Sequence, residues 1–354
     1  MPTITKTIGT TGRDYSTIAA WEADLDDSGI YSSGDDAVGE LYDDSVFDAF
    51  TTINGGGTIG LASITLTVAA TDRHDGTAGT GARLGYTGGN SVILTCDPGD
   101  TINVACRWFE IFNDGGTANR ALSFAGANIC EVSRGIFHKL RSPLVKGGAA
   151  NEPYFFNNVL YDPGSLNDGS TFAMIDSSQN LFATSYVINN TIFGSGNGTN
   201  AGAGVQYGMN EDRFDNANMV LKNNLVLDFE QDFGDDNYTL ADVGSNASAD
   251  TSASGAGAVT GVSAAAVFVS TINGSEDLHL VAGATAVIDQ GVDLGTTPTG
   301  VELDIDGRDR DAEGDTWDIG ADEFVAAAGR VTKNTRPWPL GMEIGMGWVM
   351  PNQV

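Results

Sequence analysis

The chain has 354 residues, of which 41% are hydrophobic and 18% are charged, and it contains 47 Gly and 9 Pro. This composition is typical of an ordered globular or solenoidal protein and excludes an intrinsically disordered chain. Asp and Glu outnumber Lys and Arg by 47 to 17, so the net charge of −30 opposes binding to nucleic acids and to anionic membrane surfaces.

The chain shows no targeting segment and no cysteine framework. Residues 1–14 lack the apolar run of about 7 to 15 residues that a secretory signal requires, and no stretch approaches the roughly 18 apolar residues of a membrane span. We therefore expect synthesis in the host cytoplasm without a signal peptide, and no membrane insertion. Cys96, Cys106 and Cys130 have the spacing of neither a disulfide set nor a zinc site, so we expect buried apolar residues.

The first predicted element is a short amphipathic helix at about residues 17–26. Ser16 is a suitable N-cap, and Ile18, Trp21 and Leu25 then recur at helical spacing. We assign residues 1–44 to an N-terminal cap that contains this helix.

From residue 45 onward, short strand-like runs alternate with Gly, Asn and Asp. Three of these runs resemble one another, because each is followed by an Asn-Asn pair and then by a short apolar run. The pairs end at Asn158, Asn190 and Asn224, at intervals of about 32 and 34 residues, within the roughly 20 to 50 residue periods of solenoids and propellers. Each repeat is therefore interpreted as one turn of a solenoid.

The paired asparagines have a structural explanation. Asn tolerates the left-handed conformation that a bend often needs, and an inward amide can bond to the backbone and to the equivalent Asn one turn away. We therefore predict a structural ladder of Asn158, Asn190 and Asn224 inside an all-β, right-handed parallel β-helix that spans residues 45–325. A β-propeller is the main competitor, but its blade signature is missing.

Two further segments are predicted within the solenoid. The Gly-, Ser- and Ala-rich stretch near residues 240–262 is predicted to be a long loop, and residues 277–324 are predicted to be closing turns. Within the closing turns, an alternating acidic run is compatible with a calcium site, although its Gly307 comes too early for an EF-hand. The alternative is that Arg308 and Arg310 pair with neighbouring aspartates. The candidate calcium ligands are Asp304, Asp306, Asp309 and Asp311.

The tail at residues 326–354 differs from the rest of the chain. Its three basic residues against Glu343 give a local charge of about +2, and it is rich in Trp and Met. Arg, Met and aromatic residues are enriched in interface cores, so we predict that the tail docks the protein onto a partner. The alternative is that it covers the open end of its own solenoid. The predicted docking residues are Arg330, Lys333, Arg336, Trp338, Met342, Met346 and Trp348.

We assign no catalytic residue. Polysaccharide cleavage requires two carboxylates about 5 to 10 Å apart, or a base beside acidic side chains. The available acidic and basic residues lie in no motif of such enzymes, so the sequence favours a protein without enzymatic activity. These residues are Asp176, Glu211, Asp212, Asp215, His138, Lys139 and Arg141.

Two segments resemble those of known proteins. Residues 12–21, GRDYSTIAAW, resemble the helical N-terminal cap of β-helix proteins. Residues 277–291, with the motifs DIDG at 304–307 and DIGADE at 318–323, resemble the C-terminal closing turns of bacterial and phage right-handed β-helix repeat proteins. The leaderless opening, TITKTIG, looks like that of β-helix proteins encoded among phage structural genes.

The resemblance implies a protein of the virion surface: a capsid decoration protein, a head fibre or a tailspike. The partners it implies are other capsid or tail proteins, together with a surface glycan and, by family expectation, two further copies in a homotrimer. The alternatives are a tailspike-type polysaccharide depolymerase, acting as a lyase or glycoside hydrolase, and a non-catalytic glycan-binding adhesin. No cofactor other than calcium is expected.

Overall fold

The structure is a computed structural model that describes residues 2–44, 46–48, 51–86, 92–99, 101–113, 120–124, 126–140, 144–146, 152–163, 172–177, 185–195, 206–209, 219–234, 242–312 and 316–326. Residues 1–324 form one compact unit, and residues 325–354 form another. All seven predicted docking residues of the tail lie outside the described residues, so tail docking stays a prediction.

Most regular structure in the first unit consists of parallel strands, which form three sheets among the described residues. Sheet A runs in the order β1 (Thr3–Ile8), β2 (Asp36–Leu41), β5 (Ser63–Val68), β8 (Asn103–Arg107), β11 (Ile129–Ser133), β14 (Glu152–Phe156), β17 (Ser185–Ile188), β20 (Met219–Lys222) and β23 (Asp242–Gly244). Sheet B runs in the order β3 (Val46–Asp48), β6 (Arg83–Tyr86), β9 (Glu110–Asn113), β12 (Ile136–His138), β15 (Val159–Tyr161), β18 (Thr191–Phe193), β21 (Leu225–Leu227) and β24 (Ala247–Ser248). Sheet C runs in the order β4 (Thr51–Ile53), β7 (Val92–Cys96), β10 (Arg120–Phe124), β13 (Leu144–Lys146), β16 (Phe172–Ser177), β19 (Gln206–Met209) and β22 (Gln231–Phe233).

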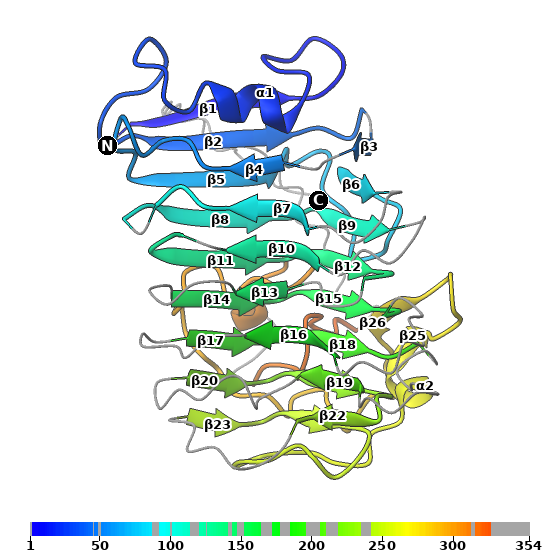
Figure 1. Cartoon of the computed structure of the whole chain (residues 1–354). Coiled ribbons are helices and arrows are strands. Elements are labelled where there is room, and N and C mark those ends of the chain that lie inside the picture. Colours follow the sequence, from blue (N-terminus) through cyan, green and yellow to red (C-terminus); the bar gives the residue numbers. More distant parts are fainter. Residues whose placement is uncertain are drawn as a thin grey trace, which may run out of the picture. The chain divides into compact units, whose positions relative to one another are not determined.

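From β2 onward, the chain visits the three sheets in a fixed rotation (Figure 1). A strand of sheet A is followed by one of sheet B and one of sheet C, and the chain then returns to sheet A beside its previous strand. We call each such circuit a coil, and β1 to β24 together the stack. The stack confirms an all-β architecture of stacked parallel strands, compatible with the predicted parallel β-helix. Its interior is filled by apolar side chains from all three sheets, and the three cysteines are free and buried, as expected.

The start of the stack differs from the sequence prediction. The predicted helix is present as α1 (Ile18–Ala23), but its N-cap is Thr17, whose side chain accepts a hydrogen bond from the Ala20 amide. Trp21 is fully buried against the first strands. β1 and β2 already pair with each other, and β2 pairs with β5, so stacking begins at Thr3 and not at residue 45. The helix is an insertion between two strands of one sheet.

The predicted loop near residues 240–262 also differs from the expectation. It contains β23 and β24, and parallel bridges join Gly244 to Ala256 and Ala247 to Val259. The segment therefore extends the stack, because its small side chains let the backbone follow the preceding coil closely.

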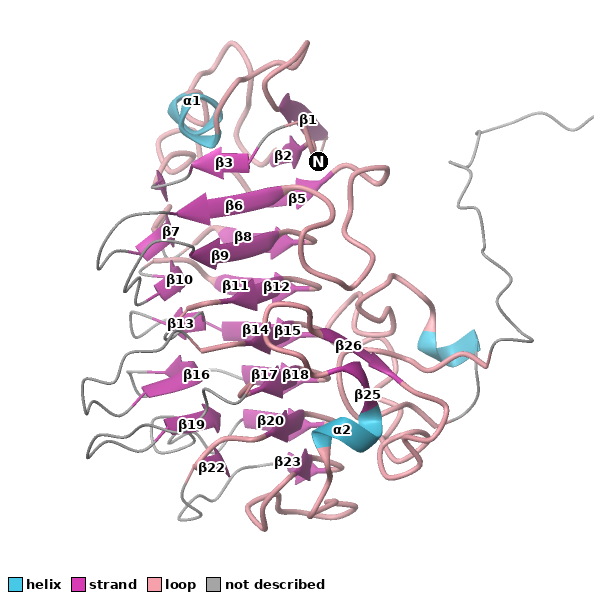
Figure 2. Ribbon diagram, turned by 90° about the vertical axis from the view of Figure 1, so that its right-hand side faces the viewer, coloured by secondary structure: helices cyan, strands magenta, loops and turns pink. Residues whose placement is uncertain are grey.

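Residues 263–324, which we call the return segment, do not add coils. They contain α2 (Ala264–Val267), an antiparallel hairpin of β25 (Phe268–Ser270) and β26 (Asp277–Leu280), and the 3-10 helix η2 (Arg310–Ala312). The hairpin and α2 lie beside the stack (Figure 2). The apolar residues of the return segment form a second core with the outer side chains of β12, β15, β18 and β21. The predicted closing turns at 277–324 are therefore a lateral cover.

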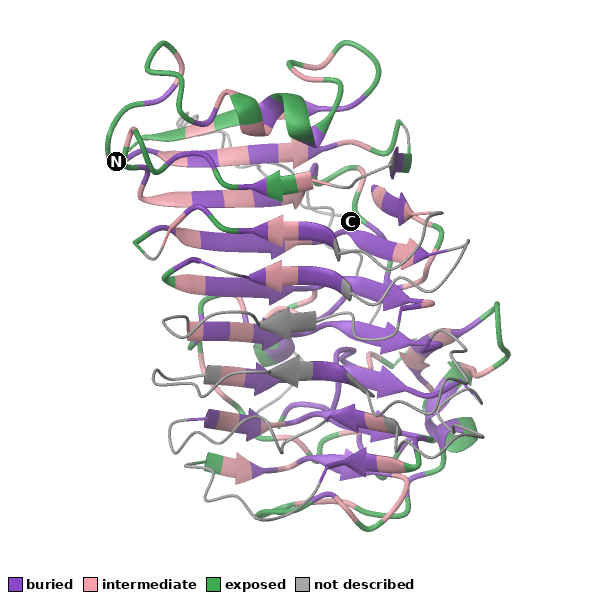
Figure 3. Ribbon diagram, in the orientation of Figure 1, coloured by how far each residue is buried: buried purple, intermediate pink, exposed green. Residues whose placement is uncertain are grey.

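Burial explains why the cover is needed. β12, β15 and β18 are buried at every residue, whereas β2 and β5 alternate between buried and half-buried (Figure 3). A strand that is apolar on both faces requires a layer on each side. The interior of the stack provides one layer and the return segment provides the other.

The predicted asparagine ladder is present at the corner between sheets A and B. The Asn158 side-chain amide donates to Asn190 Oδ1 at 3.0 Å, and Asn190 donates to Asn224 Oδ1 at 3.0 Å. Asn224 in turn donates to Asn246 Oδ1 at 3.0 Å, so the ladder has a fourth member that the sequence analysis did not include. Each of these amides is buried and also donates to a backbone carbonyl of sheet A. The ladder thus satisfies its own polar groups within the core.

The first asparagine of each pair has a different role. Asn157, Asn189 and Asn223 have φ values of 56°, 53° and 55°, in the left-handed region that Asn tolerates. Their side chains point to the return segment instead of the core. Asn157 donates to the carbonyls of Val301 and Leu303, and Asn223 exchanges two hydrogen bonds with Val292.

Replacing Asn190 with Ala should lower the free energy of unfolding by about 3 kcal/mol. The change leaves the buried Asn158 backbone amide without its acceptor, and a buried unpaired group costs about 1 to 3 kcal/mol. It also removes the side-chain bonds to Asn158 and Asn224 and the bonds to the carbonyls of Phe155 and Ile188. Chemical denaturation measures the difference. Asn128→Ala is the matched control, because Asn128 makes an exposed bond to Asn103, and a change of about 0.5 kcal/mol or less is expected. Equal losses in the two variants would contradict the role of the ladder.

Candidate functional site

Charged side chains gather where the return segment packs on the stack. Arg310, in η2, is fully buried and pairs with Glu323 at 2.9 Å. It also donates to the carbonyls of Gly320 and Ala321, both at 2.8 Å. These bonds hold residues 320–323 against η2, so Arg310 fixes the fold of the end of the return segment.

Arg308 holds a second part of the same region. It pairs with Asp306, with Asp304 at 3.6 Å and with Asp322 at 3.4 Å. The alternative interpretation of the acidic run is therefore confirmed for Arg308. For Arg310 the partner is Glu323 and not a neighbouring aspartate.

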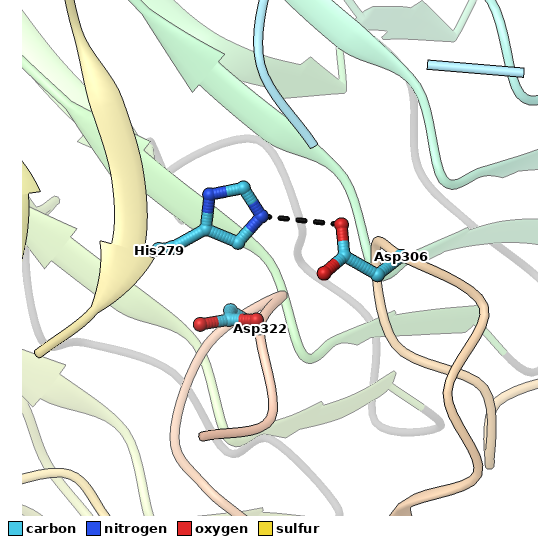
Figure 4. Close-up of side chains that lie close together, drawn as sticks. All are labelled: His279, Asp306 and Asp322. Atoms are coloured by element: carbon cyan, nitrogen blue, oxygen red, sulfur yellow. Dashed lines mark hydrogen bonds and ion pairs between the residues drawn. The ribbon is translucent and has the colours of Figure 1, made fainter. Parts of the chain in front are cut away.

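His279 lies at the centre of this region, where its ring faces Asp306, with Asp322 nearby (Figure 4), and Asp277 is paired with the other ring nitrogen. Its Nδ1 lies 2.6 Å from Asp277 Oδ1, and its Nε2 lies 3.1 Å from Asp306 Oδ1. Burial lowers the pKa of His279, but the hydrogen bond to Asp306 and the charge of the nearby Asp322 outweigh burial and raise the pKa to about 10. The ring is therefore an imidazolium at neutral pH, donating through both nitrogens.

The buried carboxylates around these cations hold protons more tightly than exposed carboxylates do. Burial raises the pKa of Asp304 to about 7, of Asp318 to about 6 and of Glu323 to about 8. Burial also raises the pKa of Asp322. The region is consequently a network in which Asp304, Asp318 and Glu323 titrate near neutral pH while His279 and Arg308 stay charged.

A metal ion would have to compete with this network. Among the described residues, His279, Asp306 and Asp322 form the group whose ligand atoms lie within 4.8 Å of one another. Both imidazole nitrogens already face carboxylates, so an ion could bind His279 only by displacing a proton from a ring of high pKa. The donor set therefore fits an ion-pair network better than a resident metal.

The four predicted calcium ligands do not converge in the structure. Asp304 accepts bonds from three backbone amides, of Asp306, Arg308 and Glu323. Asp306 pairs with His279 and Arg308. The other two face elsewhere: Asp309 accepts from the Asp311 amide, and Asp311 accepts from the Trp317 indole. Calcium binding stays a prediction, and these contacts do not support a shared site for one ion.

The remaining candidates from the sequence are only partly placed. His138 and Lys139 lie at the end of β12, on the outer side of sheet B. Asp176 belongs to β16, but its side chain lies outside the described part of the chain, as do Arg141, Glu211, Asp212 and Asp215.

Sequence reasoning did not identify the His279 network. Its members are separated by 27 residues between His279 and Asp306 and by 42 between Leu280 and Asp322, whose side chain accepts from the Leu280 amide. The available signal was local: Asp277 and His279 are two residues apart in a strand and therefore share one face. One acid and one histidine on the same face of a strand indicate that another charged side chain packs over that face from the next layer.

Comparison with known proteins found no matching family model, no matching curated protein and no matching solved structure. No helix in the described part of the chain is long and apolar enough to cross a membrane.

Replacing His279 with Gln should lower the free energy of unfolding by about 3 kcal/mol at pH 6 to 7, because it leaves Asp277 and Asp306 without their shared cation. The folded-state pKa is raised, so the stabilisation by His279 is complete below about pH 6.5 and is lost as the pH rises through about 10. Denaturation of both proteins between pH 6 and 10.5 should show the difference shrinking with rising pH.

His74→Gln is the control for this experiment. His74 is also buried, but burial lowers its pKa below that of an ordinary histidine, so it is neutral between pH 7 and 10. Its loss of stability should not depend on pH between 7 and 10. A pH-independent loss in His279→Gln as well would contradict the charged state of His279.

Proposed function

We propose that this protein is a structural component of a phage virion surface, built on a right-handed parallel β-helix. The right hand is inferred from a general rule: parallel strands joined by crossover connections have right-handed connections in about 98% of cases. The resemblance of the two end segments to phage and bacterial β-helix proteins supplies the virion setting, and the stacked parallel strands are compatible with it.

The observation that carries the proposal is the closure of the stack. At its start, Trp21 of α1 packs on the first strands, and at its end residues 256–259 bridge to β23 and β24. The return segment covers the outer face of sheet B. A stack closed in this way has few unpaired strand edges and resists edge-to-edge aggregation, as a component exposed to solvent on a particle must.

Charge supports the same function. The net charge of −30 keeps such a protein soluble and prevents it from adsorbing to nucleic acid or anionic membranes. The ionisable residues between Asp304 and Glu323 mostly bond to each other and to backbone groups, as a structural network does.

Particle fractionation tests this function. Virions of the phage that encodes the chain are purified, and their proteins are quantified by mass spectrometry. Stoichiometric presence of the chain, with loss of re-binding to stripped particles after truncation behind residue 328, is the expected result. Absence of the chain from purified particles would refute the structural function. Presence with unchanged re-binding after truncation would retain the function and reject the tail as its attachment.

A further inference from the structure

The same tetrapeptide, Thr-Ile-Asn-Gly, occurs twice in the described part of the chain, at residues 52–55 and 271–274. An Asn-Gly bond is chemically labile, because the backbone nitrogen of the glycine can attack the side-chain amide carbon of the asparagine. Glycine favours this attack, since it has no Cβ to obstruct the approach. The four residues are identical, so a difference in reactivity between Asn54 and Asn273 in the folded protein must come from the structure. A third Asn-Gly pair, at Asn197, lies outside the described residues.

The first copy is held rigidly near the start of the stack. Glu22 of α1 accepts hydrogen bonds through Oε1 from the backbone amides of Asn54 and Gly55, at 3.1 and 3.0 Å. Gly55 is buried, and it packs so closely on α1 that a Cβ at this position would lie 2.9 Å from the Leu25 Cβ. The attacking nitrogen is therefore engaged by a carboxylate, and the backbone around it has little room to rotate.

The second copy lies in the turn of the hairpin of β25 and β26, beside the stack (Figure 2). The Ile272 carbonyl accepts from the Ser275 amide at 2.8 Å, so Asn273 and Gly274 are the two central residues of a β-turn. Both are exposed, and a Cβ at Gly274 would meet no atom within 4 Å. Within the described part of the chain, no group accepts a hydrogen bond from the Gly274 amide. Here the attacking nitrogen is free and its surroundings are open.

Two Asp-Gly pairs, which can close the same ring, are protected in the same way as Asn54. The Gly76 amide donates to His74 Nδ1 at 3.3 Å, and the Gly307 amide donates to the Asp304 carbonyl at 3.0 Å. Of the Asn-Gly and Asp-Gly pairs among the described residues, the pair at 273–274 is thus the one whose glycine amide has no acceptor.

We propose that Asn273 is a site of spontaneous deamidation through a cyclic imide. The Gly274 nitrogen loses its proton and bonds to Cγ of Asn273; the bond from Cγ to Nδ2 breaks, and the side-chain nitrogen leaves with that proton as ammonia. Water then opens the ring. Addition of water at Cγ gives aspartate, and addition at the backbone carbonyl carbon gives isoaspartate, in which the main chain runs through Cβ and Cγ. This modification goes beyond the proposed structural function and does not depend on it.

Either product changes the hairpin. Each adds one negative charge to a chain that already carries −30. Isoaspartate also lengthens the main chain between Ser270 and Asp277, which pair with each other across the hairpin. Molecules of this protein should therefore separate with age into forms that differ in charge and in the length of this turn.

Peptide mapping by mass spectrometry tests the site in the full-length protein, incubated at 37 °C and sampled over several weeks. The peptide that contains Asn273 should gain one mass unit and resolve into an aspartate form and an isoaspartate form. Asn54 should react at least about tenfold more slowly, because its glycine nitrogen is released only by local unfolding. Modification of Asn273 should be faster at pH 8 than at pH 6, since the attacking nitrogen must lose its proton.

Two controls separate the effect of the structure from that of the sequence. In protein unfolded with denaturant, Asn54 and Asn273 should react at comparable rates, because their tetrapeptides are identical. Asn273→Gln should abolish the mass gain at this position and leave the melting temperature unchanged, since Gln must close a larger ring and the side chain is exposed. The proposal fails if both asparagines react equally in the folded protein, if Asn273 stays intact while the unfolded protein reacts, or if aspartate forms without isoaspartate.

Discussion

The structure depends on a pair of adjacent asparagines at one corner of each of three successive coils. The first member adopts a left-handed backbone, which turns the chain from sheet A into sheet B, and the second sends its amide into the core. Because the two side chains face opposite ways, one dipeptide serves two layers. The inner amides join the coils to each other, and the outer amides bind the backbone of the return segment.

The charged network can exist only because this outer layer is fixed. Buried ion pairs lose hydration, and they are tolerated where additional hydrogen bonds satisfy the charged atoms. Here Arg310 has two backbone carbonyls besides Glu323, and Asp304 has three backbone amides. Protons retained on Asp304 and Glu323 further reduce the repulsion among acids in a chain that already carries a charge of −30.

The coils that contain Asn-Asn could be predicted from the sequence, and the other coils could not. At the same corner of earlier coils stand Trp108 and Arg134, with φ values of 71° and 53°, so the backbone geometry repeats although the residue type does not. Asn246 was missed because its coil is only 22 residues long and lies in a low-complexity stretch.

The lateral cover was predicted to be closing turns of the stack, because short apolar runs are typical of both. The strands Val159–Tyr161 and Leu225–Leu227, apolar throughout, were the available signal for a second layer. The His279 network could not be predicted, since it joins parts of the return segment that lie 27 residues or more apart in the sequence.

The carbonyl of Val301 accepts from Asn157 at 3.0 Å and from Asn189 at 3.5 Å, and thus spans the step between two coils. Farther along the stack, the return segment bonds to Arg134 on one side and to Asn223 on the other. The contacts of the return segment therefore fit only one number of coils and one spacing between them. An evolutionary or engineered duplication of a coil between Arg134 and Asn223 would move these side chains away from their partners in the return segment. A coil added near the N-terminal end, ahead of Arg134, would leave every one of these contacts in place, so that part of the stack tolerates an added coil that the covered part does not.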